Sequence, residues 1–335
     1  MKTLALVALG SLMSLACSAP ADSGDDAPVC SASGGKVTTV FEGLDAYDAI
    51  SVEDGFVYVE VPSSGVERCA TTGCTGPSPV VSSDAFVSAT FGQSVTYTTQ
   101  ILGDDGTLGG EVRSVGLDGS GDTSLFASAV YPDYVATSGA RTFWAHDSFA
   151  VDDTPATVEC VGCGATGSTP WIMGLGGGTY GVVADASRVF VLADDASLTS
   201  VSLLSCGVSA PCFGEPTVLL TGLDRTASAQ QIASDGTNVY VARAPQSDVV
   251  RIDPSGAVTP IVTSKSVSAL AFDAASGQLY YGTQDGEVGK LAPDGSSQPT
   301  SLACTGATIA GVAVDDASVY FITGPSGSMV AKIAK

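Results

Sequence analysis

The amino-acid sequence predicts an all-β fold, a seven-bladed β-propeller in which each blade is a four-stranded antiparallel sheet. The first observation is a strand, turn and strand pattern that recurs seven times, with 39 to 50 residues between its central aromatic residues. That period is typical of propeller blades rather than of a two-sheet sandwich. The second observation is a last repeat that lacks one strand, and the third is a set of cysteines at related positions. Rings of six or eight blades fit the repeat count less well.

The repeat is clearest in residues 309–322. Ile309, Val312 and Val314 alternate along a first strand, an Asp-Asp-Ala-Ser turn follows, and residues 319–322 supply a β-branched and aromatic second strand. The second strands of the seven repeats are centred on Tyr58, Tyr97, Trp144, Phe190, Tyr240, Tyr280 and Tyr320.

Aspartates precede five of these second strands, and Asp-Gly or Pro-Ser-Gly turns follow the third strands in residues 111–121, 248–256 and 287–295. Aspartate accepts hydrogen bonds from turn amides, so a structural role in the turn explains why aspartate recurs at this position. The pattern resembles the NHL and YWTD types of propeller repeat over about residues 36–335, which implies the architecture and leaves the function open. The five aspartates are Asp54, Asp185, Asp235, Asp273 and Asp315.

The last repeat ends early, because only residues 329–334 remain as a strand after Tyr320. Residues 36–41 precede the first full repeat and read as a strand of their own. We expect this N-terminal strand to complete the last blade, which would close the ring and leave no exposed sheet edge.

The chain begins with the features of an export signal: a basic start, an apolar run over residues 4–15, and small residues. Residues 12–17 resemble a bacterial lipoprotein cleavage box, although Ser14 stands where leucine is commonest. The resemblance implies a signal peptide at 1–16, a lipid on Cys17 and, since Ser18 follows, an outer-membrane anchor facing the periplasm or the exterior. Ordinary cleavage to a secreted soluble protein is the alternative. Residues 17–33 read as an acidic tether, and 34–335 as the propeller domain.

Composition fits an exported all-β protein. Glycine makes up 40 of 335 residues and charged residues only 14%, which suits short strands joined by tight turns. The net charge is −22, so the chain would repel phosphate backbones and anionic membrane surfaces. We expect no nucleic-acid partner, and contact with a membrane only through the lipid.

Eight cysteines remain after Cys17, an even number that predicts four disulfides in an exported chain. Three pairs lie close together at the same place in their repeats and are expected to link strands three and four of a blade: Cys69 with Cys74, Cys160 with Cys163, and Cys206 with Cys212. Cys30 and Cys304 remain, and a bond between them would lock the closed ring. The spacing of Cys160 and Cys163 also occurs in redox and metal sites, which is the alternative for that pair.

Candidate catalytic groups are scarce. His146 is the one histidine, and a surface histidine at a strand end is the interpretation that we prefer over a catalytic base. No Gly-x-Ser-x-Gly motif follows a strand, and we expect no metal and no cofactor. The segment from Asp118 to Asp122 resembles the start of a calcium-binding loop but lacks the terminal glutamate, so a hairpin turn is expected there.

Two long connections between second and third strands, at residues 100–109 and 146–155, belong to adjacent blades. Loops on a rigid scaffold often carry binding residues, so these loops predict a binding face. The expected function is a monomeric, non-catalytic binding or scaffold module for a protein or small ligand; a propeller hydrolase or lyase, with channel carboxylates and calcium, is the alternative. The candidate face comprises Asp104, Asp105, His146, Asp147, Phe149, Asp152 and Asp153.

Overall fold

The computed structural model describes residues 35–335 apart from 44–48, 63, 103–107, 130, 147–155, 165–166, 196, 214, 244–245 and 325–328. The predicted signal peptide and the whole of the predicted tether lie outside these residues. None of the described helices is long and apolar enough to cross a membrane. The elements are β1 (Thr38–Glu42), β2 (Ile50–Glu53), β3 (Phe56–Val61), β4 (Gly65–Ala70), β5 (Ser78–Ser82), β6 (Phe86–Phe91), β7 (Ser94–Leu102), β8 (Leu108–Gly116), β9 (Thr123–Ala129), β10 (Pro132–Ser138), β11 (Arg141–His146), β12 (Ala156–Val161), β13 (Thr169–Leu175), β14 (Thr179–Ala184), β15 (Arg188–Asp194), β16 (Val201–Gly207), β17 (Thr217–Leu223), the 3-10 helix η1 (Ala229–Gln231), β18 (Ile232–Ser234), β19 (Val239–Arg243), β20 (Asp248–Ile252), β21 (Val258–Thr263), β22 (Val267–Asp273), β23 (Gln278–Thr283), β24 (Glu287–Leu291), β25 (Thr300–Cys304), β26 (Ile309–Val314), β27 (Ser318–Thr323) and β28 (Met329–Ala334).

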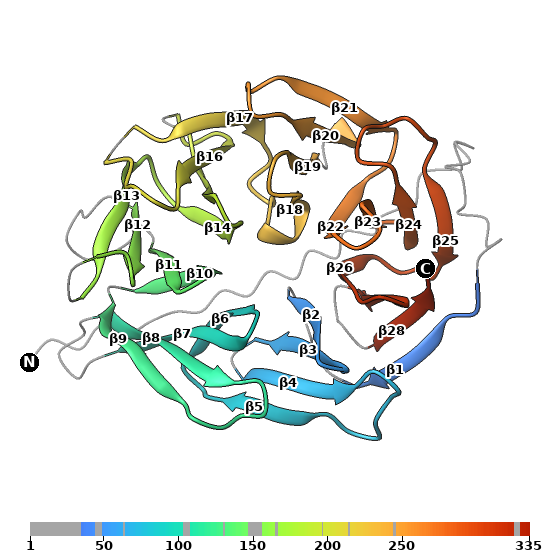
Figure 1. Ribbon diagram of the computed structural model, residues 1–335, viewed down its shortest axis with the longest axis horizontal. Helices are drawn as coiled ribbons and strands as arrows, with labels where there is room; N and C mark the ends of the chain where they lie inside the picture. The colour runs from blue at the N-terminus through green and yellow to red at the C-terminus, as the bar shows by residue number, and fades with distance from the viewer. Residues whose placement is uncertain are drawn as a thin grey trace, which may run out of the picture.

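These strands form seven four-stranded antiparallel sheets arranged in a ring, which confirms the predicted seven-bladed propeller (Figure 1). Blades 1 to 6 are the consecutive sets β2–β5, β6–β9, β10–β13, β14–β17, β18–β21 and β22–β25. The first strand of each blade lies nearest the axis and the fourth lies at the rim (Figure 1).

Blade 7 is closed by the N-terminal strand, as predicted. Strand β1 pairs antiparallel with β28, and the sheet order is β1-β28-β27-β26. Val40 and Phe41 of β1 are 3% and 4% exposed, so the closing strand also buries two large apolar side chains. The ring therefore joins its two ends by both backbone pairing and apolar burial.

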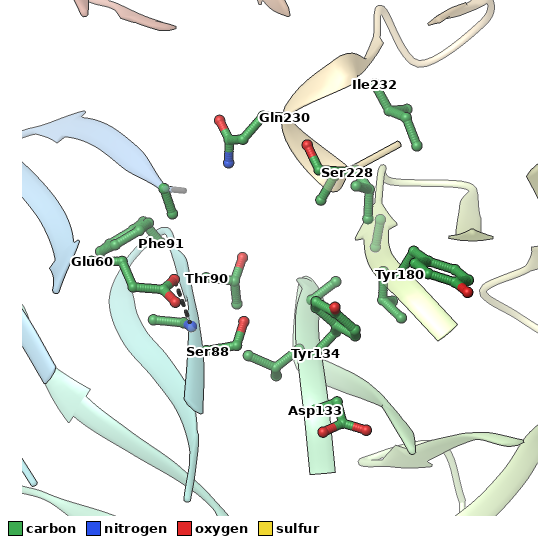
Figure 2. Close-up of a pocket in the computed structure, with 18 of the residues that line it drawn as sticks. Glu60, Ser88, Thr90, Phe91, Asp133, Tyr134, Tyr180, Ser228, Gln230 and Ile232 are labelled. Atoms are coloured by element: carbon green, nitrogen blue, oxygen red, sulfur yellow. Dashed lines mark hydrogen bonds between the residues drawn. The ribbon is translucent and has the colours of Figure 1, made fainter. Parts of the chain in front are cut away.

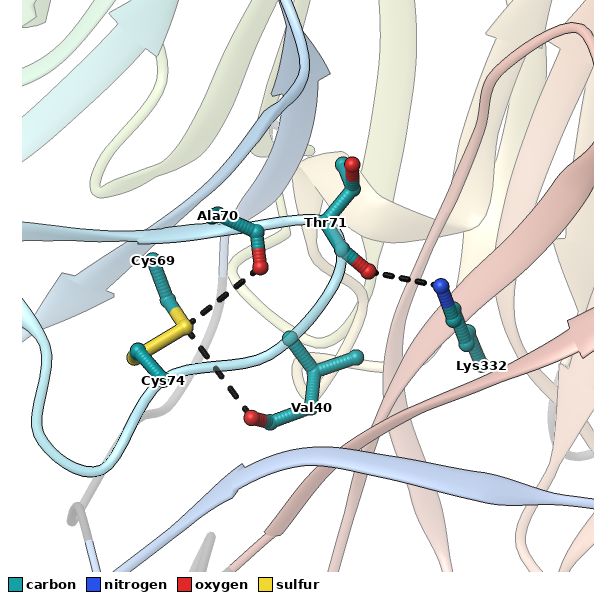
Figure 3. Close-up of a disulfide and its surroundings, with 6 residues drawn as sticks. All are labelled: Val40, Cys69, Ala70, Thr71, Cys74 and Lys332. Atoms are coloured by element: carbon teal, nitrogen blue, oxygen red, sulfur yellow. Dashed lines mark hydrogen bonds between the residues drawn. A yellow bond between two sulfur atoms is a disulfide. The ribbon is translucent and has the colours of Figure 1, made fainter.

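The first blade supports this closure. The amide of Cys74, in the turn after β4, donates to the carbonyl of Val40 at 3.3 Å. From the other side, Lys332 on β28 donates its amine to the carbonyl of Thr71 at 2.6 Å. Figure 3 shows the Cys69–Cys74 disulfide beside Val40, with Lys332 reaching the same turn.

Neighbouring blades pack through their second strands, which lie in the middle of each sheet. The central aromatic residues predicted from the repeat are all buried, from Trp144 and Phe190 at 0% exposed to Tyr97 at 4%. A strand covered by a blade on either side needs large apolar residues on both of its faces, which explains its β-branched and aromatic content.

Hydrogen bonds from side chains to backbone carbonyls also connect neighbouring blades. Arg68 of blade 1 donates from Nη1 to the carbonyl of Leu117 in the outer hairpin of blade 2, at 2.6 Å. Trp171 of blade 3 donates from Nε1 to the carbonyl of Gly207 in the outer hairpin of blade 4, at 2.9 Å. The Lys332 contact is the equivalent link from blade 7 to blade 1.

The three predicted disulfides within blades are present: Cys69–Cys74, Cys160–Cys163 and Cys206–Cys212, with Cα separations of 5.8 to 5.9 Å. Each joins a third strand to the turn that follows it. The bond between Cys160 and Cys163 leaves neither thiolate to hold a metal. Cys304 is disulfide-bonded as well, while its predicted partner Cys30 lies outside the described residues.

Aspartates of the repeat hold the turn between first and second strands. Asp235 accepts the amides of Thr237 and Asn238 and the hydroxyl of Tyr240, the last at 2.6 Å. Asp315 makes the same set of contacts in blade 7. The predicted turn role is therefore correct for Asp235 and Asp315. Asp118 likewise accepts the amide of Ser120 inside the β8–β9 hairpin, as expected for a turn.

We predict that acid weakens the fold through these turns. Burial alone would raise the pKa of Asp235, but hydrogen bonds from Asn238, Tyr240 and Thr237 outweigh it and hold the pKa below its usual value. The carboxylate therefore stabilises the fold above an unfolded pKa of about 3.9, and this contribution is lost as pH falls through the lower folded pKa.

Urea unfolding at neutral pH and at successively lower pH tests this expectation. The variant Asp235→Asn should lose stability at pH 7 and should depend less on pH below about pH 4 than the wild type does. Asp84→Asn, at an exposed position, is the matched control and should behave as the wild type. Parallel pH profiles for wild type and Asp235→Asn would show that this turn carboxylate does not stabilise the fold.

Candidate functional site

A cavity of about 640 Å³ lies on the axis of the ring. All seven innermost strands contribute to its wall, and the segment of residues 225–230 between blades 4 and 5 contributes one side. Figure 2 shows Ser88 and Thr90 of β6 and Ser228 and Gln230 of the segment before β18 around a common space. This volume is in the usual range for sites that enclose a small organic molecule.

Backbone bulges interrupt the first strands where these strands line the cavity. The register of the first strand shifts at its second residue in blades 2, 3, 4, 6 and 7. A bulge adds one residue to a strand and redirects its side chain, and such bulges are frequent beside binding sites. The bulged residues Val87, Asp133 and Tyr180 line the cavity.

The wall combines neutral polar groups with aliphatic ones. Hydroxyl and amide side chains come from β6, β10 and the segment before β18, and aliphatic residues from β14, β18, β22 and β26 fill the wall between them. Hydrogen-bonding groups spaced over an apolar wall are typical of a site that orients one small ligand. The neutral polar residues are Ser88, Thr90, Thr137, Thr226, Ser228 and Gln230.

Two carboxylates also line the cavity. Glu60 is the penultimate residue of β3, is 8% exposed, and accepts the amide of Ala89 at 3.3 Å. Asp133 accepts the side-chain amide of Gln100 at 2.7 Å. Glu60 and Gln100 occupy equivalent places in blades 1 and 2. The backbone N–H of each donates to the carbonyl of the residue just before the first strand of its own blade, Ala49 or Ala85.

A cluster of Asp194, Tyr180 and Arg225 forms one edge of the cavity. Asp194 ends β15, and its side chain is only 2% exposed. Its carboxylate accepts the amide of Gly178 at 2.9 Å, the hydroxyl of Tyr180 at 3.0 Å, and Nη2 of Arg225 at 2.7 Å. Arg225 also donates from Nε to the Tyr180 hydroxyl at 2.8 Å.

Electrostatics within this cluster favour an ionised guanidinium and a neutral phenol. Burial is the main reason that the pKa of Tyr180 is raised; the hydrogen bond from Arg225 opposes this and the Asp194 carboxylate adds to it. Hydrogen bonds to Tyr180 and then to Asp194 raise the pKa of Arg225. Arg225 is therefore a permanent cation held in one orientation.

The predicted binding face can be followed only in part. His146 ends β11 in blade 3, so its position in the chain is as expected, but it is 3% exposed and not the surface residue that we predicted. No described residue accepts or donates a hydrogen bond at its Nδ1, and it does not line the cavity. The other members of the face lie outside the described residues: Asp104, Asp105, Asp147, Phe149, Asp152 and Asp153.

The sequence reasoning missed the cavity residues Glu60, Asp133, Tyr180 and Arg225. Glu60 and Asp194 had a usable signal, because each is a carboxylate in the last two positions of a mostly apolar second strand. Among the described residues, no group of three or more histidine, cysteine or acidic side chains could hold a metal ion.

Comparison with known proteins places the chain by its fold. No protein-family model matches the chain, and no curated protein matches it. Streptogramin B lyase superposes with a TM-score of 0.57 and 12% identity, over 89% of this chain and 97% of that one. Virginiamycin B lyase from Staphylococcus aureus gives a TM-score of 0.57 and 11% identity, over 90% and 99%.

A third neighbour is a puromycin hydrolase, with a TM-score of 0.59 and 13% identity. The match covers 83% of this chain and 50% of the hydrolase, so the chain spans about half of that enzyme's length. At these identities the likeness extends to the propeller fold alone.

Proposed function

We propose that this chain is an exported, lipid-anchored, non-catalytic binding protein whose ligand is a small molecule held in the axial cavity. The observation that carries the proposal is the 640 Å³ cavity, walled by hydroxyl and amide side chains from several blades. A rigid ring positions these groups before any ligand arrives, which lowers the entropic cost of binding.

The export and anchoring part of the proposal is supported by the sequence of residues 1–17 and by the disulfides, which persist in oxidising compartments. The location that we propose is the outer membrane. Mass spectrometry of the mature N-terminus is the corresponding test, with a fatty-acylated Cys17 as the expected species and an unmodified later residue as the contrary one.

A lyase or hydrolase is the second candidate, because the carboxylates of Glu60 and Asp133 line the cavity and the fold neighbours include a lyase and a hydrolase. Against it, a virginiamycin B lyase with a histidine-to-alanine substitution is described as catalytically inactive. This chain has one histidine, His146, which is buried and does not line the cavity.

A thermal-shift screen with amino acids, acylated dipeptides, saccharides and organic acids tests binding in the cavity. We expect compounds that raise the melting temperature of the wild type to have no effect on Thr90→Trp, which fills the cavity from β6. Thr259→Trp, on the exposed outer strand β21, is the control and should respond as the wild type does.

Two results would contradict the proposal. Compounds that stabilise Thr90→Trp as well as the wild type would bind elsewhere. Conversion of a bound compound to a product, abolished by Glu60→Gln, would favour the enzyme instead.

A further inference from the structure

Arg225 is the one basic side chain among the described residues that line the cavity. Its side chain is 49% exposed, although two of its nitrogens are held by Tyr180 and by the buried Asp194. Guanidinium carries five N–H groups in a planar fork, and these two contacts use only part of that set. The cluster thus fixes the orientation of the fork, in a side chain that lines the cavity and has N–H groups beyond those two contacts.

From this arrangement we propose that the cavity takes a ligand with one carboxylate, and that Arg225 binds that carboxylate. The proposal rests on the proposed function and adds the chemical class of the ligand. Paired N–H donors match a carboxylate in geometry, and such charge-assisted hydrogen bonds are stronger than neutral ones. Tyr180 and Asp194 act as positioning residues, since they hold the guanidinium before binding.

The rest of the wall limits the remainder of the ligand. Ser228 and Gln230 lie on the same segment as Arg225, and Figure 2 shows both facing the cavity opposite Thr90. These neutral groups suit amide or hydroxyl functions close to the carboxylate. The carboxylates of Glu60 and Asp133 on the other walls disfavour a second negative group, so a monoanion fits better than a dicarboxylate or a phosphate.

A structural role for Arg225 is the competing explanation, because its contacts also fasten residues 224–228 to blade 4. The two explanations differ in one measurable property. A purely structural arginine gives no preference between an acid and the corresponding amide, whereas a carboxylate-binding arginine does.

Matched acid and amide pairs therefore provide the test, with hippurate against hippuramide and N-acetyl-leucine against its amide as probes at millimolar concentration. By calorimetry we expect the wild-type propeller domain, with β1 intact, to bind each acid at least about 10-fold more tightly than its amide. Arg225→Gln should abolish this preference, and Arg225→Lys, which keeps the charge but loses the fork, should retain a reduced one. Phenyl phosphate should bind more weakly than the acids.

Arg188→Gln is the matched control, since Arg188 pairs with Asp185 in the same blade but does not line the cavity. It should keep the full preference. Equal binding of acids and amides by the wild type, or a preference that survives in Arg225→Gln, would overturn the inference while leaving a binding cavity in place. Failure of every probe and of the whole screen would overturn the proposed function as well.

Discussion

Removal of β1 is expected to destabilise the whole ring. A chain that begins at residue 44 would leave β28 as an open edge and would expose the surface that now covers Val40 and Phe41. The two side chains alone account for about 4 kcal/mol of apolar burial, and the lost strand pairing adds to this. That sum is comparable with the whole stability of many domains, so we expect an unfolded or aggregated product.

The matched control is a chain that begins at residue 35 and keeps β1 intact. Because both truncations also remove Cys30, Cys304→Ser should be included in each so that no free thiol remains. Circular dichroism and thermal melting would compare the two proteins. Similar melting temperatures would show that β1 does not close the ring energetically.

Replacement of Trp171 is the second change with a large expected effect. Its side chain is 2% exposed, packs edge-on against Phe143 at 5.6 Å between ring centroids, and donates to Gly207 of the next blade. Trp171→Ala should lower the free energy of unfolding by about 4 kcal/mol, through lost burial and the cavity left behind.

Trp171→Phe separates packing from the hydrogen bond. It retains most of the ring but loses the Nε1 donor, so we expect a loss of about 1 to 2 kcal/mol. Met173→Ala, at an exposed position on the same strand, should change stability by less than about 0.5 kcal/mol. Denaturant unfolding gives all three values, and similar losses for Trp171→Ala and Met173→Ala would contradict the account.

The architecture was readable from the sequence because each blade repeats the same physical problem. A second strand covered on both faces requires residues such as Tyr240 and Tyr320, and a tight turn before it requires Asp235 or Asp315. These requirements recur in the chain and so reveal its period. The missing strand of the last blade then left the N-terminal strand as its partner, and the pairing of β1 with β28 follows that logic.

The candidate site was not readable in the same way, because it depends on departures from the repeat. The bulges at Asp133 and Tyr180, two residues that line the cavity, shift the backbone register without a residue pattern that marks them. Arg225 lies in a connection between blades, 31 residues after Asp194, and the antiparallel pairing of β15, β16 and β17 brings the two together at one edge of blade 4. His146 shows the reverse error, since its burial depends on neighbours that the local sequence does not identify.

A crystal structure of the domain with bound hippurate would test the central claim most directly, namely that the axial cavity is the ligand site of this protein. The account predicts the ligand on the axis, with its carboxylate on Arg225 and its amide near Ser228 or Gln230. A ligand bound on the outer strands or on the long connections of blades 2 and 3, with the cavity empty, would contradict it.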